Sequence, residues 1–386
     1  MTKEPGAFRR GRLLRAWREG RLGPLGMVLT PVAWAYRAGF LAREAAYRRG
    51  WLARGRLSCA VVSVGNLAVG GTGKTPTVEM VARWLTEDGR RVAILSRGYG
   101  RRPGGPVELV SDGGEPRLSA ERAGDEPLLL ARRLPGVAVV VGVDRLAAGR
   151  WAVSELQPDV VLLDDGFQQR RLLKDLEIVC LDARAPWGPG GLFPRGTLRE
   201  PPSALGRADL VVLTRAGGRR NLAGMFQEIR QYAGAAPCLA ADYAIEGLRD
   251  LHSGAPQPRD AIAGRGVLAF AGIAAPERLA EALAGLAAIV RGVVAFPDHH
   301  RYTPHDLDAV TRRARALGAS LLVTTEKDAV RLGPSAPGHT GGAFLPIWVL
   351  GIRLEAVTGA PLDAWRAALR AGVERATREG RAETRP

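Results

Sequence analysis

One short glycine-rich stretch constrains the fold of this chain more than any other feature. It reads Ala68-Val69-Gly70-Gly71-Thr72-Gly73-Lys74-Thr75, follows the apolar run Ala60–Val64 and precedes an amphipathic segment that begins at Pro76. This order of strand, glycine loop, Lys-Thr and helix is that of a P-loop. In a P-loop, backbone N–H groups cradle phosphates at a helix N-terminus, the lysine reaches the outer phosphates and the threonine hydroxyl contacts Mg²⁺. The stretch therefore predicts a nucleoside-triphosphate site formed by residues 68–75.

Ala68 stands where glycine is commonest in P-loops. The glycines that let the backbone approach phosphate are all present, at Gly70, Gly71 and Gly73, so the departure at position 68 does not weaken the prediction. A short glycine motif also occurs by chance in ordinary strand–helix turns. Here the strand before the motif and the helix after it favour a nucleotide site.

Composition places the chain among soluble globular proteins. Its 386 residues suffice for two domains with cores of their own, and 46% of them are hydrophobic. The formal net charge of +16 comes almost entirely from arginine, since the lysines are only Lys3, Lys74, Lys174 and Lys327. Such a charge favours acidic partners, namely nucleotide, anionic lipid or nucleic acid. Aromatic residues make up only 6% and no nucleic-acid-binding module is recognised, so we expect no nucleic acid.

The cysteines indicate the cellular compartment. Cys59, Cys180 and Cys238 are scattered, odd in number and without metal-ligand spacing. They predict a reducing cytoplasm and no disulfide framework.

The apolar runs predict an α/β fold of the P-loop NTPase type, in which a mostly parallel sheet is flanked by helices, with a second, smaller α/β domain. In the first domain, strands are expected after the P-loop at residues 91–95, 137–143, 160–163, 178–181 and 210–213. In the second, strands are expected at 267–270, 289–296, 320–324 and 347–350, and helices at 276–286, 304–317 and 362–377.

Four regions follow from these patterns. Residues 1–55 form a basic amphipathic helical region, and residues 56–235 form the nucleotide-binding domain. Residues 236–265 lose the α/β rhythm and predict a linker with a small β-ribbon. Residues 266–386 form the second domain, which is expected to close over the active site, and its final nine residues are expected to fray.

The N-terminal region has an arginine-dense start and an apolar continuation. Residues 1–21 hold Arg9, Arg10, Arg12, Arg15, Arg18 and Arg21. Residues 22–36 carry no charge, but a bilayer span takes about 20 apolar residues, so the run is too short to cross. No small-residue cleavage site follows, which argues against export. Between Thr30 and Leu52, apolar and aromatic residues recur at helical spacing, which fits either a helix packed on the first domain or one lying in a membrane interface.

Two carboxylates end one of the predicted strands. Asp164 and Asp165 directly follow the run Val160–Leu163, which is where a P-loop protein places the acid that holds Mg²⁺ opposite the P-loop hydroxyl. A strand-end aspartate can also cap the next turn. The P-loop upstream favours the metal role, and either aspartate satisfies the pattern.

Asp125, Glu126 and Pro127 open an apolar helix. Asp followed closely by Pro is a common helix start. The functional alternative is that Asp125 accepts a proton from an attacking hydroxyl during phosphoryl transfer.

Two adjacent histidines follow a predicted strand of the second domain, in the sequence Phe296-Pro297-Asp298-His299-His300-Arg301-Tyr302. Zinc is disfavoured because no further ligands stand at useful spacing. A histidine beside a carboxylate is better suited to assist proton transfer, provided that the second domain closes over the P-loop.

Basic loops follow several strands at the edge where open α/β sheets bind their ligands. They contain Arg97 and Tyr99, then Gln168, then Arg199, and suit anionic groups of nucleotide or substrate; solvated surface arginines are the alternative. The late strand ends in Thr214-Arg215-Ala216-Gly217 rather than in the Asn-Lys-x-Asp that reads guanine, so ATP is expected.

Further motifs recur along the chain in a fixed order. They are Val64–Leu67 running into the P-loop, Ser96–Gly100, Gly124–Pro127, Asp164–Gln168, Leu198–Pro201, Phe270–Ile273 and Asp298-His299. In this ordered set the chain resembles the tetraacyldisaccharide 4′-kinases, the lipid A 4′-kinases of Gram-negative bacteria, over about residues 25–350.

The resemblance implies an ATP- and Mg²⁺-dependent transfer of the γ-phosphate to the 4′-hydroxyl of a tetraacylated glucosamine disaccharide 1-phosphate. It implies that Asp125 is the catalytic base working with His299, and that Lys74 stabilises phosphate charge. It implies that Thr75 and Asp164 or Asp165 hold Mg²⁺, with Glu126 nearby. One departure is visible, because Gln169 stands where the family usually carries His.

The resemblance also implies a place in the cell: the cytoplasmic face of the inner membrane, with the N-terminal helix docked on lipid and no obligate protein partner. The alternative function is a P-loop NTPase switch or metal-cofactor chaperone. Such a switch needs neither a basic, Trp-bearing membrane helix nor an Asp–His pair facing the γ-phosphate.

Overall fold

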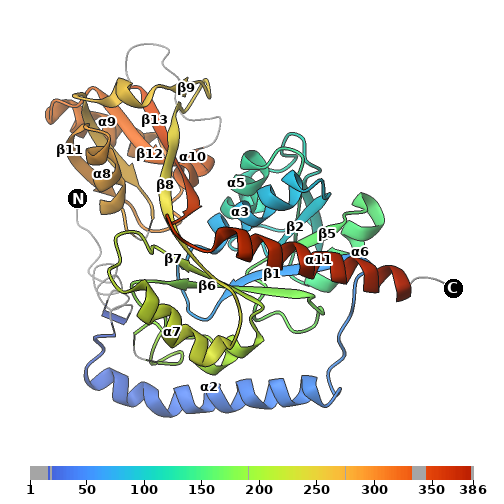
Figure 1. The fold of residues 1–386 in the computed structure, drawn as a ribbon. Coiled ribbons are helices and arrows are strands. Elements are labelled where there is room, and N and C mark those ends of the chain that lie inside the picture. The colour runs from blue at the N-terminus through green and yellow to red at the C-terminus, as the bar shows by residue number, and fades with distance from the viewer. Residues whose placement is uncertain (1–15, 18–19, 190, 274, 333–344, 384–386) are drawn as a thin grey trace. The chain divides into compact units, whose positions relative to one another are not determined.

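The structure is a computed structural model that describes residues 16–17, 20–189, 191–273, 275–332 and 345–383 (Figure 1). The chain forms two compact units. The first unit comprises residues 1–97, 136–242 and 354–386, and the second comprises residues 98–135 and 243–353. Both contain parallel strands that alternate with helices, so the predicted α/β class is confirmed.

The first unit is built on a parallel sheet with strand order β8-β7-β6-β1-β5-β2-β4. Its strands are β1 (Ala60–Asn66), β2 (Val92–Ser96), β4 (Ala138–Gly142), β5 (Val160–Asp164), β6 (Leu176–Asp182), β7 (Leu210–Thr214) and the start of β8 (Cys238–Asp250). Nearly every residue of β1 to β7 in this sheet is buried. These are the continuous apolar runs of the sequence, because a parallel sheet is covered on both faces.

Helices cover this sheet. They are α3 (Lys74–Glu87), α6 (Arg145–Leu156) and α11 (Leu362–Glu383), which contact its strands. The same unit contains α2 (Pro24–Arg48), the 3-10 helix η1 (Pro202–Arg207) and α7 (Leu222–Ala233), which packs against η1. The helix α11, red in Figure 1, packs on β1, β6 and β7. Its Trp365 is fully buried and donates from Nε1 to the carbonyl of Val211 at 3.1 Å.

The helix α11 also corrects one expectation about the C-terminus. The predicted fraying of the last nine residues is wrong for residues 378–383, which continue α11; residues 384–386 lie outside the described residues. The buried face that includes Leu369, Val373 and Ala376 anchors the helix to the sheet, and the six residues that extend it need only local hydrogen bonds.

The second unit contains a smaller sheet with strand order β11-β10-β12-β13-β8. The strands of this sheet are the end of β8, β10 (Gly266–Ala271), β11 (Ile289–Ala295), β12 (Leu321–Thr325) and β13 (Ile347–Ala356), and β9 (Pro256–Gln257) pairs with β8. The unit also contains β3 (Val107–Ser111), which is not part of this smaller sheet. Its helices are α4 (Ala120–Ala123), α5 (Asp125–Arg133), the 3-10 helix η2 (Arg259–Ile262), α8 (Glu277–Gly285), α9 (Pro304–Ala316) and α10 (Glu326–Leu332).

The strand β10 shows how this smaller sheet is covered. Its residues Val267, Ala269 and Ala271 belong to one apolar cluster together with residues of α8. The alternate residues Leu268 and Phe270 belong to a second cluster with residues of α9. Successive side chains of a strand point to opposite faces, so α8 and α9 cover opposite faces of this sheet.

The compact units divide the chain differently from the boundaries expected above. Residues 98–135, expected in the nucleotide-binding domain, belong to the second unit, and residues 354–386, expected in the second domain, belong to the first. The reason is packing: α5 lies against α10 in the second unit, and α11 packs on the first sheet. The region expected as a linker contains a 13-residue strand, β8, whose end pairs with β9 as a small antiparallel ribbon.

The N-terminal helix α2 contacts the rest of the first unit through three polar side chains. The Tyr36 hydroxyl donates to the carbonyl of Arg199 at 2.9 Å, Arg43 donates to the carbonyl of Gln168 at 3.0 Å, and Arg170 pairs with Glu44 at 2.9 Å. The arginine-dense start up to residue 19, except for residues 16 and 17, lies outside the described residues.

Apolar residues of α2 are exposed on more than one side of the helix. Met27, Trp34 and Leu41, spaced seven residues apart, lie on the side opposite Tyr36 and Arg43, and Leu25, Val28 and Val32 are exposed as well. By length and composition alone α2, with its 25 residues, is long and apolar enough to cross a membrane. The expectation that this region is too short to cross is therefore wrong on length, because it counted only the uncharged run. The contacts of Tyr36, Arg43 and Glu44 with the rest of the first unit distinguish α2 from a transmembrane helix that has no contact with the protein beside it.

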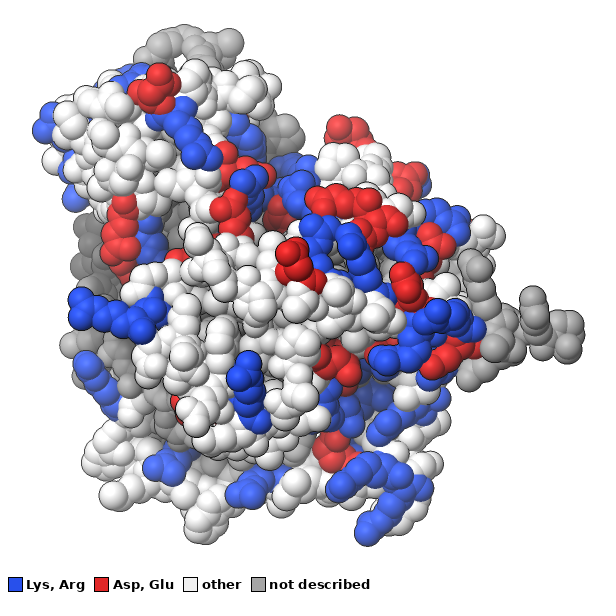
Figure 2. Space-filling view, in the orientation of Figure 1, with Lys and Arg blue, Asp and Glu red and all other residues white. Residues whose placement is uncertain are grey.

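Charge on the surface is mixed. On the face shown in Figure 2, the described arginines and lysines stand among carboxylates and uncharged surface. The net charge of +16 is thus not gathered into one basic tract on this face, as an extended nucleic-acid footprint would require.

Candidate functional site

The P-loop lies between the end of β1 and the start of α3. Gly73 caps α3 in the left-handed region, with φ 88°, and makes no side-chain cap hydrogen bond. A Cβ atom added to Gly70 or Gly71 would meet nothing within 4 Å, so the loop borders open space there. The first N–H groups of a helix have no intrahelical partner. This helix start therefore offers backbone donors and the positive end of its dipole to an anion.

Buried polar side chains hold the P-loop in shape. The Asn66 amide donates to the carbonyl of Ala68 at 2.6 Å and to the Thr72 hydroxyl at 2.8 Å. The Thr214 hydroxyl, at the end of β7, donates to the carbonyl of Thr72 at 2.9 Å. Asn66 and Thr214 are both fully buried. These contacts fix the loop from two neighbouring parts of the sheet.

The loop that carries Arg199 runs beside the P-loop. Val69 donates to the carbonyl of Thr197 at 2.7 Å, and Arg199 donates from its backbone to Leu67 at 2.7 Å. The Arg199 guanidinium then reaches Asp165 at 2.9 Å and the Gln168 amide oxygen at 3.2 Å. Two residues that the sequence predicted as substrate contacts, Gln168 and Arg199, thus lie together at the phosphate site.

The two strand-end carboxylates differ in their surroundings. Asp164 pairs in register with Val64 of β1, is 5% exposed and accepts a hydrogen bond from the Ser96 hydroxyl at 2.8 Å. Asp165 is in the left-handed region, with φ 54°, a conformation that costs energy for a residue with a side chain. Its carboxylate lies 3.7 Å from the Lys74 ammonium.

The charge state of Asp165 follows from its neighbours. Burial acts to raise its pKa, but the nearby cations Lys74 and Arg199 outweigh burial and hold the pKa below its usual value. Asp165 is therefore an anion at neutral pH, placed between two cations at the mouth of the P-loop.

The donor atoms at this site fit Mg²⁺. The Thr75 hydroxyl and the carboxylates of Asp164 and Asp165 are hard oxygen donors. No group of three or more His, Cys, Asp or Glu residues able to hold a metal ion occurs in the part of the chain that the structure describes. The fit is therefore to an ion that takes its other ligands from phosphate and water, as Mg²⁺ does.

A second group of predicted residues meets in the second unit. We call Asp125, His299 and Arg331 the acid–base cluster. The His299 Nδ1 atom lies 2.9 Å from Asp125 Oδ2, and the Arg331 Nε atom donates to the same oxygen at 2.7 Å. Asp125 is the first residue of α5, and His299 follows β11 with φ 60°, a second left-handed residue at a predicted site. The structure thus brings together two residues that stand 174 positions apart in the sequence.

The pKa values of this pair move in opposite directions. Burial acts to raise the pKa of Asp125, but hydrogen bonds from His299 and Arg331 outweigh it, so the pKa lies below its usual value. The hydrogen bond to Asp125 raises the pKa of His299, and burial only partly opposes it. Both shifts favour a carboxylate beside an imidazolium.

The other predicted residues have mixed surroundings. Glu126, expected near the metal, forms an ion pair with Lys327 of α10. Tyr99 is 79% exposed, and its ring centroid lies 6.2 Å from that of His299. Arg97 is exposed at the end of the first segment of the first unit. The predicted roles of these residues remain predictions.

Sequence reasoning missed three polar residues that hold these sites. Arg145 is 4% exposed and donates to the carbonyls of Gly142, at 2.7 Å, and Asp164, at 3.4 Å. Its position just after the predicted strand 137–143, at the ligand edge, is a signal that could have found it. Ser96, whose partner Asp164 lies 68 positions away, opens the motif Ser96–Gly100 after the predicted strand 91–95, which is the same kind of signal. Arg331 offered none, because its partner Asp125 lies 206 positions away.

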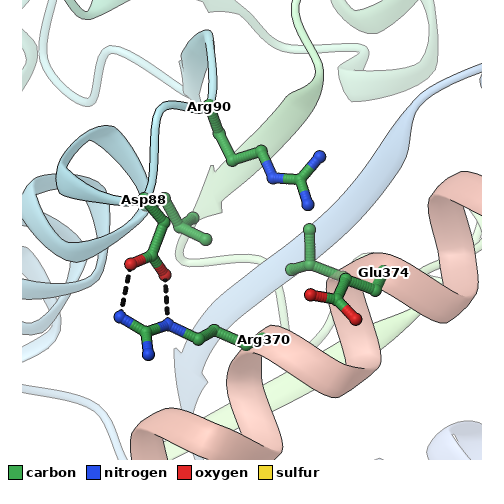
Figure 3. A pocket seen from close by; sticks show the side chains of 6 residues that line it. Asp88, Arg90, Arg370 and Glu374 are labelled. Carbon is green, nitrogen blue, oxygen red and sulfur yellow. Dashed lines mark hydrogen bonds and ion pairs between the residues drawn. The ribbon is translucent and has the colours of Figure 1, made fainter.

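A surface cavity of about 220 Å³ lies elsewhere in the first unit and is lined by charged side chains (Figure 3). Asp88, the C-cap of α3, pairs there with Arg370 of α11. The P-loop is at the other end of α3, about 20 Å away at 1.5 Å per residue. No predicted site residue lines this cavity, so it is not the nucleotide site.

Comparison with known proteins decides the family. The model of the family described as tetraacyldisaccharide-1-P 4′-kinase matches residues 25–370. The chain belongs to this family.

Relatives match over most of their length. The tetraacyldisaccharide 4′-kinase of Anaeromyxobacter dehalogenans strain 2CP-C is 48% identical over 331 residues, which are 84% of this chain and 87% of the relative. That of Syntrophus aciditrophicus is 42% identical over 84% of this chain and 89% of the relative. The crystal structure of LpxK from Aquifex aeolicus in complex with ATP has a TM-score of 0.73 and 31% identity, and covers 90% of this chain and 99% of that one.

These matches confirm the resemblance inferred from the motifs, and the family match continues 20 residues past residue 350 into α11. They also confirm the P-loop NTPase-type fold. At position 169, where the resemblance implies His, Gln169 is half-buried and donates from its backbone to the carbonyl of Gly166 at 2.9 Å. A role that depends on an imidazole at this position does not carry over to this chain.

Proposed function

We propose that this chain transfers the γ-phosphate of ATP to the 4′-hydroxyl of a tetraacylated glucosamine disaccharide 1-phosphate, a step of lipid A biosynthesis. The observation that carries the proposal is the combination of a P-loop phosphate site with an Asp125–His299 pair 2.9 Å apart, in a chain that belongs to this kinase family. An NTPase switch needs the first feature and has no use for the second.

At the phosphate site, the backbone of residues 68–75 binds the ATP phosphates and Lys74 stabilises negative charge on the outer ones. Thr75 and the Asp164–Asp165 pair hold Mg²⁺, with Glu126 as a further candidate. When bound, Mg²⁺ supplies neutralisation of phosphate charge. Ser96 and Arg145 hold Asp164 in place through a hydrogen bond to its carboxylate and one to its backbone.

At the acid–base cluster, Asp125 accepts the proton of the 4′-hydroxyl as that oxygen bonds to the γ-phosphorus. The bond between the γ-phosphorus and the β–γ bridging oxygen breaks, and ADP leaves with the electron pair. His299 orients the Asp125 carboxylate. The proposal includes closure of the second unit over the phosphate site during the reaction, with Arg97, Tyr99, Gln168 and Arg199 contacting the lipid headgroup.

We further propose that α2 binds the enzyme to the cytoplasmic face of the inner membrane without crossing it. The support is its two-sided surface: Tyr36, Arg43 and Glu44 contact the first unit, while Met27 and Trp34 are 80% and 69% exposed. Residues seven positions apart lie along one stripe of a helix. An apolar stripe with a Trp and flanking arginines suits the headgroup–acyl boundary.

The deciding experiment uses labelled ATP, Mg²⁺ and a tetraacyl disaccharide 1-phosphate in detergent micelles. We expect label in the lipid, lost in Asp125→Ala and retained in the matched control Asp112→Ala, which changes an exposed aspartate of the same unit. Label that appears only as free phosphate, whether or not lipid is present, would replace the kinase with an NTPase switch.

The membrane proposal has a separate test. Trp34→Glu is expected to reduce co-sedimentation with anionic vesicles, whereas Ile352→Glu, at an exposed apolar residue of the second unit, should not. Wild-type protein that never co-sediments would refute the membrane role of α2.

A further inference from the structure

The helix α10 contacts both acids at the start of α5. Lys327 pairs with Glu126, and Arg331, four residues later and therefore on the same face of the helix, pairs with Asp125. A third ion pair joins Glu326 of α10 to Arg133 at the end of α5. All six residues belong to the second unit. The packing of α10 on α5 thus fixes the direction in which each acid points.

Hydrogen bonds to buried groups other than Asp125 fix the Arg331 side chain. Its Nη1 atom donates to the carbonyl of Gly272 at 2.9 Å and to Asp328 Oδ1 at 3.1 Å. Asp328 is fully buried and accepts further hydrogen bonds from the Tyr302 hydroxyl at 2.9 Å, the Thr325 hydroxyl at 2.6 Å and the Gly272 backbone at 3.0 Å. The Arg331 side chain is 3% exposed. A guanidinium held by so many buried partners cannot turn toward a substrate.

The two donors to Asp125 use the same oxygen. His299 Nδ1 and Arg331 Nε both bond to Oδ2 of Asp125. The Asp125 side chain is 20% exposed. Among the residues that the structure describes, Oδ1 of Asp125 has no hydrogen-bond partner. A carboxylate anchored through one oxygen leaves the other at a defined position and free to accept a proton.

We infer that Arg331 is a positioning residue for the catalytic base: together with His299 it fixes Asp125 through Oδ2 and thereby presents Oδ1 to the acceptor hydroxyl. This inference rests on the proposed function. It assigns Arg331 a role in turnover without contact with ATP or lipid, since its donors are used within the second unit.

The inference is tested by Arg331→Gln in the wild-type and Asp125→Ala backgrounds, with kcat, KM for both substrates and ATP affinity measured. In the wild-type background we expect kcat to fall about 10- to 100-fold, because misplacement by about 1 Å can cost that much. We expect KM values and ATP affinity to change less than about 2-fold. In the Asp125→Ala background the same change should alter kcat less than about 2-fold, since residues that act as a unit are not additive.

Arg133→Gln is the matched control. It removes the other arginine that joins α5 to α10, with no contact to Asp125. Whatever it costs in turnover through stability should be the same in both backgrounds, because its effect does not pass through the base.

The following results would overturn the positioning role of Arg331 or the assignment of the base. Undiminished kcat in Arg331→Gln, or an equal loss in both backgrounds, would overturn the positioning role. If Arg331→Gln does not fold, Arg331→Lys, which keeps a cation without the forked contacts, takes its place and should show the same coupling with a smaller loss. Near-normal turnover in Asp125→Ala alone would overturn the base assignment itself, which distinguishes the two failures.

Discussion

The phosphate site of the first unit and the acid–base cluster of the second are built in different ways. At the phosphate site, eight consecutive residues supply the binding surface, mostly through backbone, and buried Asn66 and Thr214 hold the loop. At the cluster, Asp125, His299 and Arg331 come from three separate segments and meet through side chains. The phosphate site is a continuous sequence motif, whereas the residues of the acid–base cluster are brought together only by folding.

The contrast extends to how charge is used. At the phosphate site Lys74 and Arg199 surround Asp165, a cationic setting for anionic ligands. In the cluster, Arg331 and His299 both act on one oxygen of one carboxylate. A phosphate site needs positive charge that complements the phosphates. A general base must also be held in the orientation in which it meets the hydroxyl, and more than one hydrogen bond is needed to fix that orientation. The two sites should therefore fail differently when mutated.

The largest expected effect is that of Asp125→Ala. Losing a positioned base should lower kcat by about 10²- to 10⁴-fold, while ATP affinity stays within about 2-fold because the P-loop is untouched. Steady-state kinetics and equilibrium ATP binding measure the two separately. Loss of ATP binding would contradict the separation of the two sites.

Lys74→Ala should damage both properties. Removing one charged donor to phosphate typically costs about 10²- to 10³-fold in turnover. ATP affinity should fall as well, because the same lysine neutralises phosphate in the ground state. If ATP affinity were unchanged and only turnover fell, the phosphate site would respond to mutation as the acid–base cluster does. That result would refute the expected difference between the two sites.

Ser96→Ala addresses the support of the metal site. Its hydroxyl donates to buried Asp164 at 2.8 Å, and removing a group that orients a metal ligand typically costs about 10-fold or more in metal affinity. We expect about 10-fold more Mg²⁺ for half-maximal activity. The control is Ser111→Ala, a buried serine at the end of β3 that bonds only local backbone; a similar Mg²⁺ shift in this variant would refute the effect.

The smallest expected effect is a change in the pKa of His299, which NMR titration measures. Because the hydrogen bond to Asp125 raises the pKa of His299, the imidazolium persists to higher pH than in a free histidine. The stabilisation that comes from the raised pKa of His299 is fully present below the ordinary pKa of histidine as long as Asp125 is ionised, and it is lost as pH rises through the raised pKa. In Asp125→Asn the pKa of His299 should fall toward about 6.5, as followed by NMR titration. Asp298→Asn, 4.0 Å away, should lower it less; the reverse order would be inconsistent with the pair.

Much of this architecture was predictable from the sequence. The apolar runs predicted β1, β2, β4 to β7 and β10 to β12 to within a few residues, and the start of β13, since a strand buried on both faces is a continuous apolar run. They missed β3, and they missed β8, which lies in the region expected as a linker. The P-loop was predictable because its function depends on glycines and an adjacent Lys-Thr in one stretch. Asp125 and His299 were nominated from the residues individually, through their place at a helix start and at a strand end, and the resemblance to the family implied that they work together.

The tertiary structure alone decided the rest. It placed residues 98–135 in the second unit and returned residues 354–386 to the first, because unit membership depends on which surfaces pack together. It supplied Arg331 and Thr214, whose partners lie 206 and 142 positions away. The sequence determined the local elements and the phosphate loop, since hydrogen bonds and periodicity act over a few residues. The direction of the base is set by contacts between distant segments, which no local pattern records.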